Sequence, residues 1–150
     1  MRIMILNGPN LNLLGTRKPE VYGTQTYDDL VQFLNTVAGS LNMTLTLRQT
    51  QYEGDLITSL HEAHERAFDA VLLNAGAYTH YGYALHDAIE AISVPVVEVH
   101  LSDLSKRTEP WRQHSVLEPV CVARFMGEGF HSYDAALRFC KTHYDPLKNS

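Results

Sequence analysis

The sequence has few of the features that mark export, membrane insertion or nucleic-acid binding. Its only two cysteines, Cys121 and Cys140, stand in apolar surroundings. They predict reduced core thiols and a cytoplasmic protein, with a disulfide between them as the alternative. No run of about 18 apolar residues occurs, so we expect no transmembrane helix. An apolar strand already begins at Arg2 or Ile3, which leaves no room for a signal peptide. A net charge of -5 argues against a nucleic-acid partner, because such proteins normally carry a basic face.

Motifs for nucleotides and metals are also lacking. The glycine-rich turns, including the one at 127–129, match neither a Walker loop nor a dinucleotide fingerprint. His61, Glu62, His64 and Glu65 resemble a zinc-protease helix, but that motif needs histidines four residues apart and these are three apart. A solvated helix face is the favoured interpretation, and we expect neither a metal nor another cofactor.

What is present is the composition of one globular domain. The chain has 150 residues, of which 45% are hydrophobic and 19% are charged. These values are ordinary for a protein with a single hydrophobic core. Because repeats, low-complexity segments and linkers are missing, we expect residues 1–150 to form one domain.

Strand-like and helix-like patterns alternate along the chain. Residues 26–41 show helical spacing, with Leu30, Leu34 and Leu41 on one face and Thr26 as the N-cap. Further helices are predicted at 53–68, at 83–92, and from a cap at Ser132 to about His143. Strands are predicted at 2–6, 44–49, 70–74, 96–100 and 120–125.

Strands separated by helical crossovers predict a parallel sheet covered on both faces. Five strands in this length suggest a flavodoxin-like, doubly wound α/β/α fold. Ligands of such sheets bind beyond the carboxyl ends of the strands. The strand ends carry Asn7, Gln49 to Gln51, Asn74, Glu98 and His100. We therefore expect these polar residues to gather at one edge of the sheet.

The stretch from Asn7 to Gly23 is too long for a simple connection between a strand and a helix. It carries amide side chains, then Arg17 and Tyr22, and we interpret it as an active-site lid. A phenol titrates near 10, and each unit of depression needs about 1.4 kcal/mol in favour of the phenolate. Arg17 could supply this in a closed, dry site. The alternative is an exposed tyrosine beside a solvated arginine.

Glu98 and His100 lie two residues apart in a strand, so their side chains project to the same face. A carboxylate can orient an imidazole and make it a proton donor near neutral pH. The alternative is a core histidine bonded to a backbone carbonyl.

The segment 73–87 passes from a strand end through a glycine turn into a helix, where backbone N–H groups can form an anion site. Asn74 could donate to a substrate oxygen or hold a water. His80 could contact a hydroxyl or carboxylate, or could make only a local hydrogen bond at the helix start.

Several motifs together resemble one enzyme family. They are ILNGPNLNLLG, an arginine followed by YG, YEGDLI, NAGAYTH, EVHLSD and WRQHS. In this order and spacing they are similar to the type II 3-dehydroquinate dehydratases, over nearly the whole chain. The resemblance implies a flavodoxin-like subunit, a dodecamer built from trimers, and no metal or cofactor. It implies trans dehydration of 3-dehydroquinate to 3-dehydroshikimate through an enolate. The step serves aromatic biosynthesis or quinate breakdown.

The resemblance also implies residue roles in acid–base chemistry. Tyr22 matches the base that removes the proton beside the ketone, and Arg17 matches the lid arginine that favours its phenolate. His100 matches the acid that protonates the departing hydroxyl, with Glu98 as its orienting partner. Asn12 lies in the matching loop near the site.

Other positions match substrate contacts of the family. Asn74 matches the asparagine associated with a water at the enolate oxygen, and Asp87 matches an acid that reaches a neighbouring subunit's site. The remaining matches are His80, Leu101, Ser102 and Arg112.

The chain departs from the family pattern in two regions. Ala75, Tyr81, Gly82 and His86 replace the usual proline, threonine-serine pair and arginine, and Gln51 stands where asparagine is common.

The segment 107–112 carries one extra residue and a proline. It leaves two candidates for the substrate carboxylate, Arg112 first and Arg107 second. An inactive family member and a flavodoxin-like anion-binding module remain the alternative functions.

Overall fold

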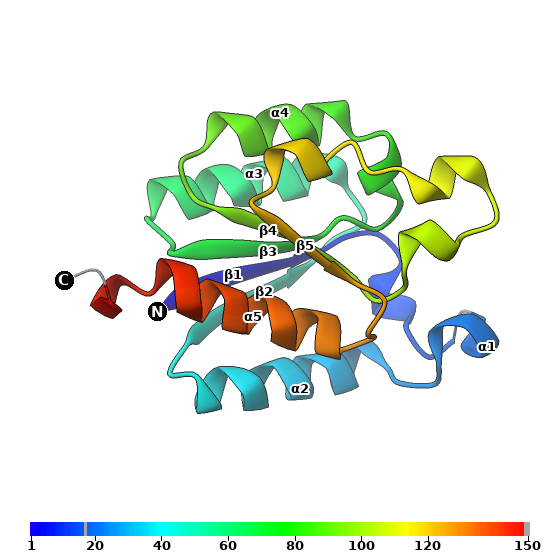
Figure 1. Ribbon diagram of the computed structural model, residues 1–150, viewed down its shortest axis with the longest axis horizontal. Coiled ribbons are helices and arrows are strands. Elements are labelled where there is room, and N and C mark those ends of the chain that lie inside the picture. Colours follow the sequence, from blue (N-terminus) through cyan, green and yellow to red (C-terminus); the bar gives the residue numbers. More distant parts are fainter. Residues whose placement is uncertain (17, 149–150) are drawn as a thin grey trace.

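The computed structural model describes residues 1–16 and 18–148 and is built around a five-stranded parallel sheet (Figure 1). Its strands are β1 (Arg2–Asn7), β2 (Thr44–Gln49), β3 (Ala70–Asn74), β4 (Val96–His100) and β5 (Ala123–Met126). The strand order is β2-β1-β3-β4-β5. This order, with helices on both faces, confirms the predicted flavodoxin-like, doubly wound fold.

Four longer helices cover the sheet. Helices α2 (Tyr27–Ser40) and α5 (His131–Tyr144) lie on one face, and α3 (Glu53–Glu65) and α4 (Tyr83–Ala91) lie on the other (Figure 1). Within β1, Ile3 and Ile5 pack toward α2 and α5, whereas Met4 and Leu6 pack toward α3 and α4. Each buried side chain of this size stabilises the fold by about 1.5–3 kcal/mol. A strand covered on both faces needs apolar residues at nearly every position, as this strand has.

The register of the strands brings their polar ends together. Asn7 pairs with Gln49 of β2 and with Asn74 of β3. Glu98 of β4 pairs with Leu73, one residue before Asn74. The predicted row of polar residues therefore lies at one edge of the sheet.

The two predicted helix caps had different outcomes. Thr26 caps α2 as predicted: its Oγ1 accepts from the Asp29 N–H at 3.1 Å, and its own N–H donates to Asp29 Oδ2 at 2.8 Å. The cap at Ser132 was wrong, because α5 begins one residue earlier, at His131. The turn before α5 is already helical, and Ser132 Oγ instead accepts from the Glu128 N–H at 3.0 Å.

Two predicted element ends were also displaced. The fifth strand begins at Ala123 rather than at residue 120, because Pro119 opens a 3-10 turn, η5 (Glu118–Val120). Helix α3 ends at Glu65 rather than at Phe68. Ala67 adopts a left-handed φ of 51°, which ends the helix and lets the Phe68 N–H donate back to the Ala63 carbonyl at 2.9 Å.

The predicted lid contains two short helical turns, η1 (Leu11–Leu13) and α1 (Pro19–Tyr22). Helix α1 lies at the end of the molecule opposite both termini (Figure 1). Gly15 and Gly23 have φ values of 87° and 79°. Residues with a side chain rarely adopt such φ values, so both bends favour glycine.

Short 3-10 turns complete the chain: η2 (Gly76–His80), η3 (Leu104–Lys106), η4 (Pro110–Gln113) and η6 (Pro146–Lys148). Within residues 1–16 and 18–148, no helix is both long enough and apolar enough to cross a membrane.

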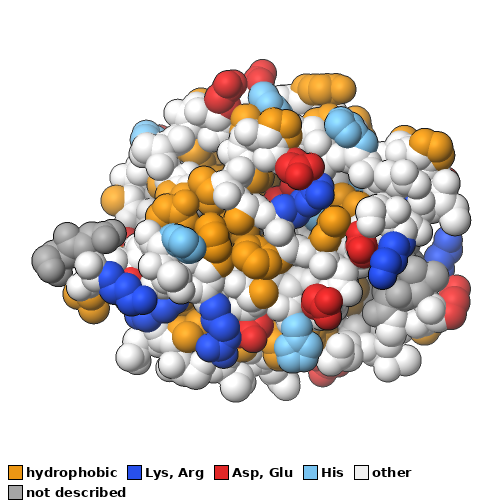
Figure 2. All heavy atoms as spheres, in the orientation of Figure 1, with side chains coloured by type: hydrophobic (Ala, Val, Ile, Leu, Met, Phe, Trp, Pro, Cys, Tyr) orange, Lys and Arg blue, Asp and Glu red, His pale blue; other side chains and the backbone are white. Residues whose placement is uncertain are grey.

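Strand β5 forms one border of the sheet and is accompanied by an apolar surface. Hydrophobic side chains gather over β5 and the neighbouring part of α5 (Figure 2). Val122 is 48% exposed, and the half-buried rings of Phe125 and Phe139 lie 5.7 Å apart. In the described part of the chain, nothing pairs with the outer side of this strand.

Candidate active site

A pocket of about 330 Å³ opens beyond the carboxyl ends of β1, β3 and β4. Its wall combines the start of the lid, the turn of residues 74–76 after β3 (the NAG turn) and the polar segment after β4. The lining residues are Pro9, Asn10, Leu11, Leu13, Leu14, Asn74, Gly76, Ala77, His80, His100, Leu101, Ser102, Leu104, Arg107 and Arg112.

A close backbone contact joins the lid to the NAG turn. The Gly8 N–H donates to the Asn74 carbonyl at 2.7 Å. A Cβ at Gly8 would lie 2.6 Å from the Ala75 carbonyl oxygen. Glycine is therefore required at position 8 because of this backbone approach.

Glu98 and His100 form a buried pair at the end of β4. His100 Nε2 lies 2.7 Å from Glu98 Oε1, so a carboxylate and not a backbone carbonyl orients the ring. The same carboxylate oxygen accepts from Thr79 Oγ1 and Ser115 Oγ, each at 2.6 Å. Glu98 Oε2 has no hydrogen-bond partner among the described residues.

The hydrogen bonds around Glu98 keep it charged. Burial is the largest single influence and raises the pKa of its carboxyl group, whereas the hydrogen bond and the charge of His100 lower it. Hydrogen bonds from Ser115 and Thr79 act in the same direction, and the pKa lies below its usual value. An ionised carboxylate only accepts hydrogen bonds, so Nε2 of His100 carries the hydrogen that it donates to Glu98. Nδ1 is then the other ring nitrogen of His100, a residue that lines the pocket.

His80 is held by a backbone carbonyl. Its Nδ1 lies 2.7 Å from the His114 oxygen, and a carbonyl only accepts, so Nδ1 carries the proton. Burial lowers the pKa of His80, and the positive groups nearby act in the same direction. The neutral ring therefore has Nε2 available as an acceptor, which suits contact with a hydroxyl.

Two arginines from the segment after β4 line the same pocket. Arg107 Nη2 donates to Ser102 Oγ at 2.9 Å. Arg112 lies with its Cζ 4.2 Å from the centre of the Trp111 ring, and its Nε is 3.4 Å from Glu109 Oε1. Both arginines can meet an anionic ligand, as the sequence suggested.

A buried hydrogen-bond chain fixes the amides on the other face of the sheet. The Tyr133 hydroxyl of α5 donates to Asn7 Oδ1 at 2.6 Å and accepts from Asn74 Nδ2 at 2.9 Å. Asn74 Oδ1 accepts from the Gly76 N–H at 3.2 Å. Burial raises the pKa of Tyr133, so it stays a neutral phenol in this chain.

Two asparagines of the lid lie differently with respect to the pocket, and Asn12 is in the loop beside it, between the lining residues Leu11 and Leu13. Asn12 is exposed and does not line the pocket; its Oδ1 accepts from Gln51 Nε2 at 2.9 Å. Asn10 lines the pocket instead, and its N–H donates to Gln51 Oε1 at 2.9 Å. Asn10 has a left-handed φ of 70° and starts the η1 turn, which places Asn10 on the pocket wall.

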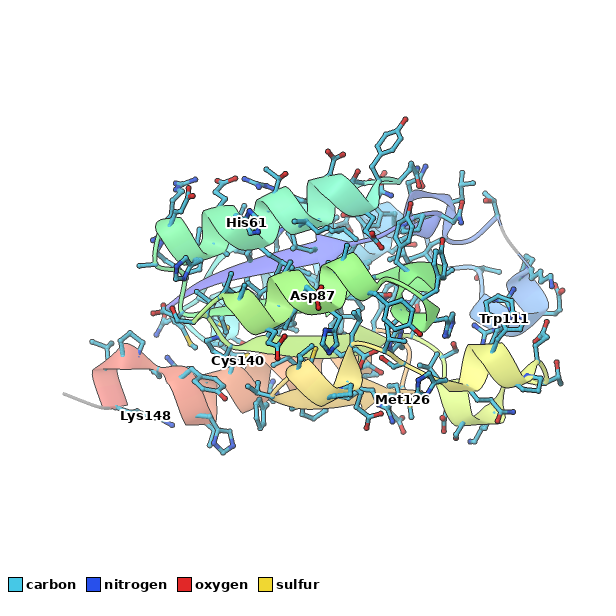
Figure 3. All side chains as sticks on the ribbon, turned by 90° about the horizontal axis from the view of Figure 1, so that it is seen from above. His61, Asp87, Trp111, Met126, Cys140 and Lys148 are labelled. Carbon is cyan, nitrogen blue, oxygen red and sulfur yellow. The ribbon has the colours of Figure 1, made fainter. Side chains whose placement is uncertain are left out.

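The other expected site residues lie partly outside this geometry. Asp87 is exposed on the outer side of α4, away from the pocket of its own chain (Figure 3). Arg17 lies outside the described residues. Tyr22 is the last residue of α1, and its side chain is also outside the description. His61 is exposed on α3 (Figure 3).

Four contributors to the site were missed at the level of sequence: Thr79, Ser115, Tyr133 and Trp111. The first three reach Glu98, Asn7 or Asn74 from positions 17 to 126 residues away. No local pattern carries such a contact, and only the helical spacing of α5 places Tyr133 on a buried face.

Comparisons with known proteins agree with this geometry. The family model for dehydroquinase class II matches residues 1–141. The 3-dehydroquinate dehydratase of Bacillus pumilus is 52% identical over 136 residues, which cover 91% of each chain.

Two solved structures are also similar to this chain. The type II dehydroquinase of Butyrivibrio crossotus has a TM-score of 0.91 at 39% identity and covers 93% of this chain and 97% of its own. The enzyme of Propionibacterium acnes has a TM-score of 0.89 at 36% identity and covers 94% and 96%. The chain therefore belongs to the dehydroquinase class II family.

Proposed function

We propose that this chain is a lyase that dehydrates 3-dehydroquinate to 3-dehydroshikimate in the shikimate pathway. Relatives at up to 52% identity carry the name of this activity. The observation that carries the proposal is the buried Glu98–His100 pair, 2.7 Å apart, on the wall of a pocket with two arginines.

His100 is the general acid for the departing hydroxyl. Glu98 holds Nε2–H, so Nδ1 is the nitrogen that delivers the proton. The carboxylate stabilises the imidazolium and fixes the ring, and a positioned acid of this kind contributes about 10²–10⁴-fold.

Tyr22 is the base, and Arg17 favours its phenolate. The lid that carries both residues also supplies Leu11, Leu13 and Leu14 to the pocket, so it covers the site with apolar side chains. A base on the lid and an acid on β4 would act from opposite sides of the ring, as a trans elimination requires.

The enolate oxygen is stabilised by amide donors. Asn74 lines the pocket, and its second N–H remains for a water or for the substrate beside the bond to Tyr133. Asn10 shares this wall, and we assign it the place first expected for Asn12, which supports the loop through Gln51.

The polar substituents of the substrate ring contact the pocket wall formed by η2 and the segment after β4. Arg112 binds the carboxylate, with Arg107 as the second cation. Ser102 and the Leu101 N–H bind the remaining oxygens, and His80 Nε2 accepts from a hydroxyl. Neither a metal nor another cofactor is needed for this step.

We further propose a cytoplasmic homo-oligomer, a dodecamer built from trimers, with no nucleic-acid or membrane partner. The outward position of Asp87 on α4 supports a role at a neighbouring subunit's site. The apolar surface over β5 (Figure 2) supports a contact between subunits.

The test is to mix the purified protein with 3-dehydroquinate and follow the enone absorbance of the product, with and without EDTA. We expect turnover that EDTA leaves unchanged, and its near loss in Tyr22→Phe. Absence of turnover in the wild-type protein would contradict the proposal. Undiminished turnover in Tyr22→Phe would refute the role of that phenol alone.

A further inference from the structure

The one tryptophan of the chain stands beside the pocket without lining it. Trp111 lies in η4 between Pro110 and Arg112, and it is 52% exposed. Figure 3 shows it at the end of the molecule that also carries α1, opposite the C-terminal Lys148.

The Trp111 ring touches two groups that do line the pocket. The guanidinium carbon of Arg112 lies 4.2 Å from the ring centre, the geometry of a cation–π contact. The His80 ring lies 5.3 Å away at 88°, an edge-to-face arrangement. Both partners come to the ring from the pocket wall.

Among the described residues, the other polar contact of the Arg112 side chain, which is 25% exposed, is with Glu109. Its ion pair with Glu109 has a distance of 3.4 Å, and the glutamate is 51% exposed. Such exposed pairs fix a side chain only weakly. Arg107 differs, because its guanidinium donates to the Ser102 hydroxyl at 2.9 Å.

We propose that Trp111 is a positioning residue for substrate binding: its ring braces Arg112 and His80 and so sets the wall that receives the carboxylate. The proposal rests on the function proposed above. Trp111 acts through Arg112 and touches neither the acid nor the reacting carbons, so its removal changes the Michaelis constant and not the chemical step.

The experiment compares kinetics of Trp111→Ala and Trp111→Phe with those of the wild-type protein. For a half-exposed cation–π contact, we expect Trp111→Ala to raise KM about two- to fivefold. We expect kcat to stay within about twofold in both variants. Trp111→Phe keeps an aromatic ring at this position, so its KM should stay close to that of the wild-type protein. Leu147→Ala, which shortens another exposed apolar side chain near Lys148, is the control and should change neither constant.

A double-mutant cycle separates positioning from a general structural effect. Arg112→Ala alone should raise KM, and adding Trp111→Ala should then raise it by less than about 1.5-fold, because the contact with Arg112 is already lost and only the edge-to-face contact with His80 remains. Since Trp111 is the only tryptophan, Arg112→Ala should also change its fluorescence emission, and this readout does not depend on activity.

Two results would overturn the proposal while leaving the activity intact: an unchanged KM in Trp111→Ala, or KM effects that multiply independently in the double variant. A fall in kcat at constant KM would equally refute it. A wild-type protein without turnover would instead refute the proposed function.

Discussion

The two sides of the pocket are built in opposite ways. The β4 side is buried and densely hydrogen-bonded: Glu98 Oε1 accepts three hydrogen bonds, from His100, Thr79 and Ser115. The lid side consists of short turns, and its bend at Lys18 requires a left-handed φ of 41°.

In the mechanism that we propose, this difference separates a preset acid on β4 from a base on the lid. The acid needs one fixed orientation, which a rigid strand with buried hydrogen bonds supplies without reorganisation. The base must admit a substrate and then exclude water, which suits a segment with few buried contacts. The comparison can be tested by changing each side separately.

The largest effect is expected on the buried side. His100→Ala should lower kcat about 10²–10⁴-fold, because the proton donor for the leaving hydroxyl is lost. The enone assay measures this, and His61→Ala is the matched control, since His61 is an exposed histidine on α3. A kcat within about tenfold of wild type would mean that the acid is not on this wall.

The second-largest effect is expected when the buried phenol hydroxyl of Tyr133 is removed. Tyr133→Phe should lower the free energy of unfolding by about 1–3 kcal/mol, because Asn7 and Asn74 are left with unsatisfied buried groups. Urea unfolding at unchanged m value measures it. Tyr83→Phe is the control, since that tyrosine is 69% exposed, and an equal effect there would show that the buried network is not special.

A pair of glycine substitutions compares the two ends of the lid. A Cβ at Gly8 meets the Ala75 carbonyl oxygen at 2.6 Å, so Gly8→Ala should cost about 1–3 kcal/mol and shift the pocket wall. A Cβ at Gly23 meets nothing within 4 Å, so Gly23→Ala should cost only the backbone strain of its φ of 79°, about 1–3 kcal/mol, and leave the pocket wall in place. Urea unfolding measures both costs, and a Gly8→Ala variant as stable as the wild-type protein would show that the close backbone contact does not fix this end of the lid.

The smallest effect concerns a carboxylate at the protein surface, Glu62, whose side chain is 29% exposed. Hydrogen bonds from Arg48 and Arg66 lower the pKa of Glu62 from 4.5 to about 2. A depressed pKa gives stability that is present above pH 4.5 and is lost as the pH falls toward about 2. Glu62→Gln should therefore flatten the acid side of the Tm profile.

Salt distinguishes this exposed carboxylate from the buried one. About 1 M salt should remove most of the Glu62 effect, because exposed charges are screened. The contribution of Glu98, whose pKa is also lowered but inside a buried network, should persist in salt. The same salt sensitivity for both carboxylates would contradict the contrast between buried and exposed polar groups.

Much of the scaffold was predictable from local patterns. Four of the five strands and the cap at Thr26 follow from apolar runs and side-chain chemistry that act over a few residues. The shared face of Glu98 and His100 follows from the two-residue period of a strand. The fifth strand starts later because the turn at Pro119 takes over its first residues, and α5 starts earlier because Phe130 is already helical.

The partners inside the site were not predictable. Asn10 and Asn12 are equivalent by composition, and only the turn of η1 decides that Asn10 lines the cavity. Trp111 could have been an exposed residue without a role until the fold placed His80 beside it.

The sequence by itself determined a parallel, doubly wound sheet with its polar residues at one edge, because strand and helix periods are local properties. Only the tertiary structure decided which donors keep Glu98 charged, which amides Tyr133 holds and which ring contacts Arg112. These choices depend on contacts between distant segments, whose positions are fixed by packing and not by spacing along the chain.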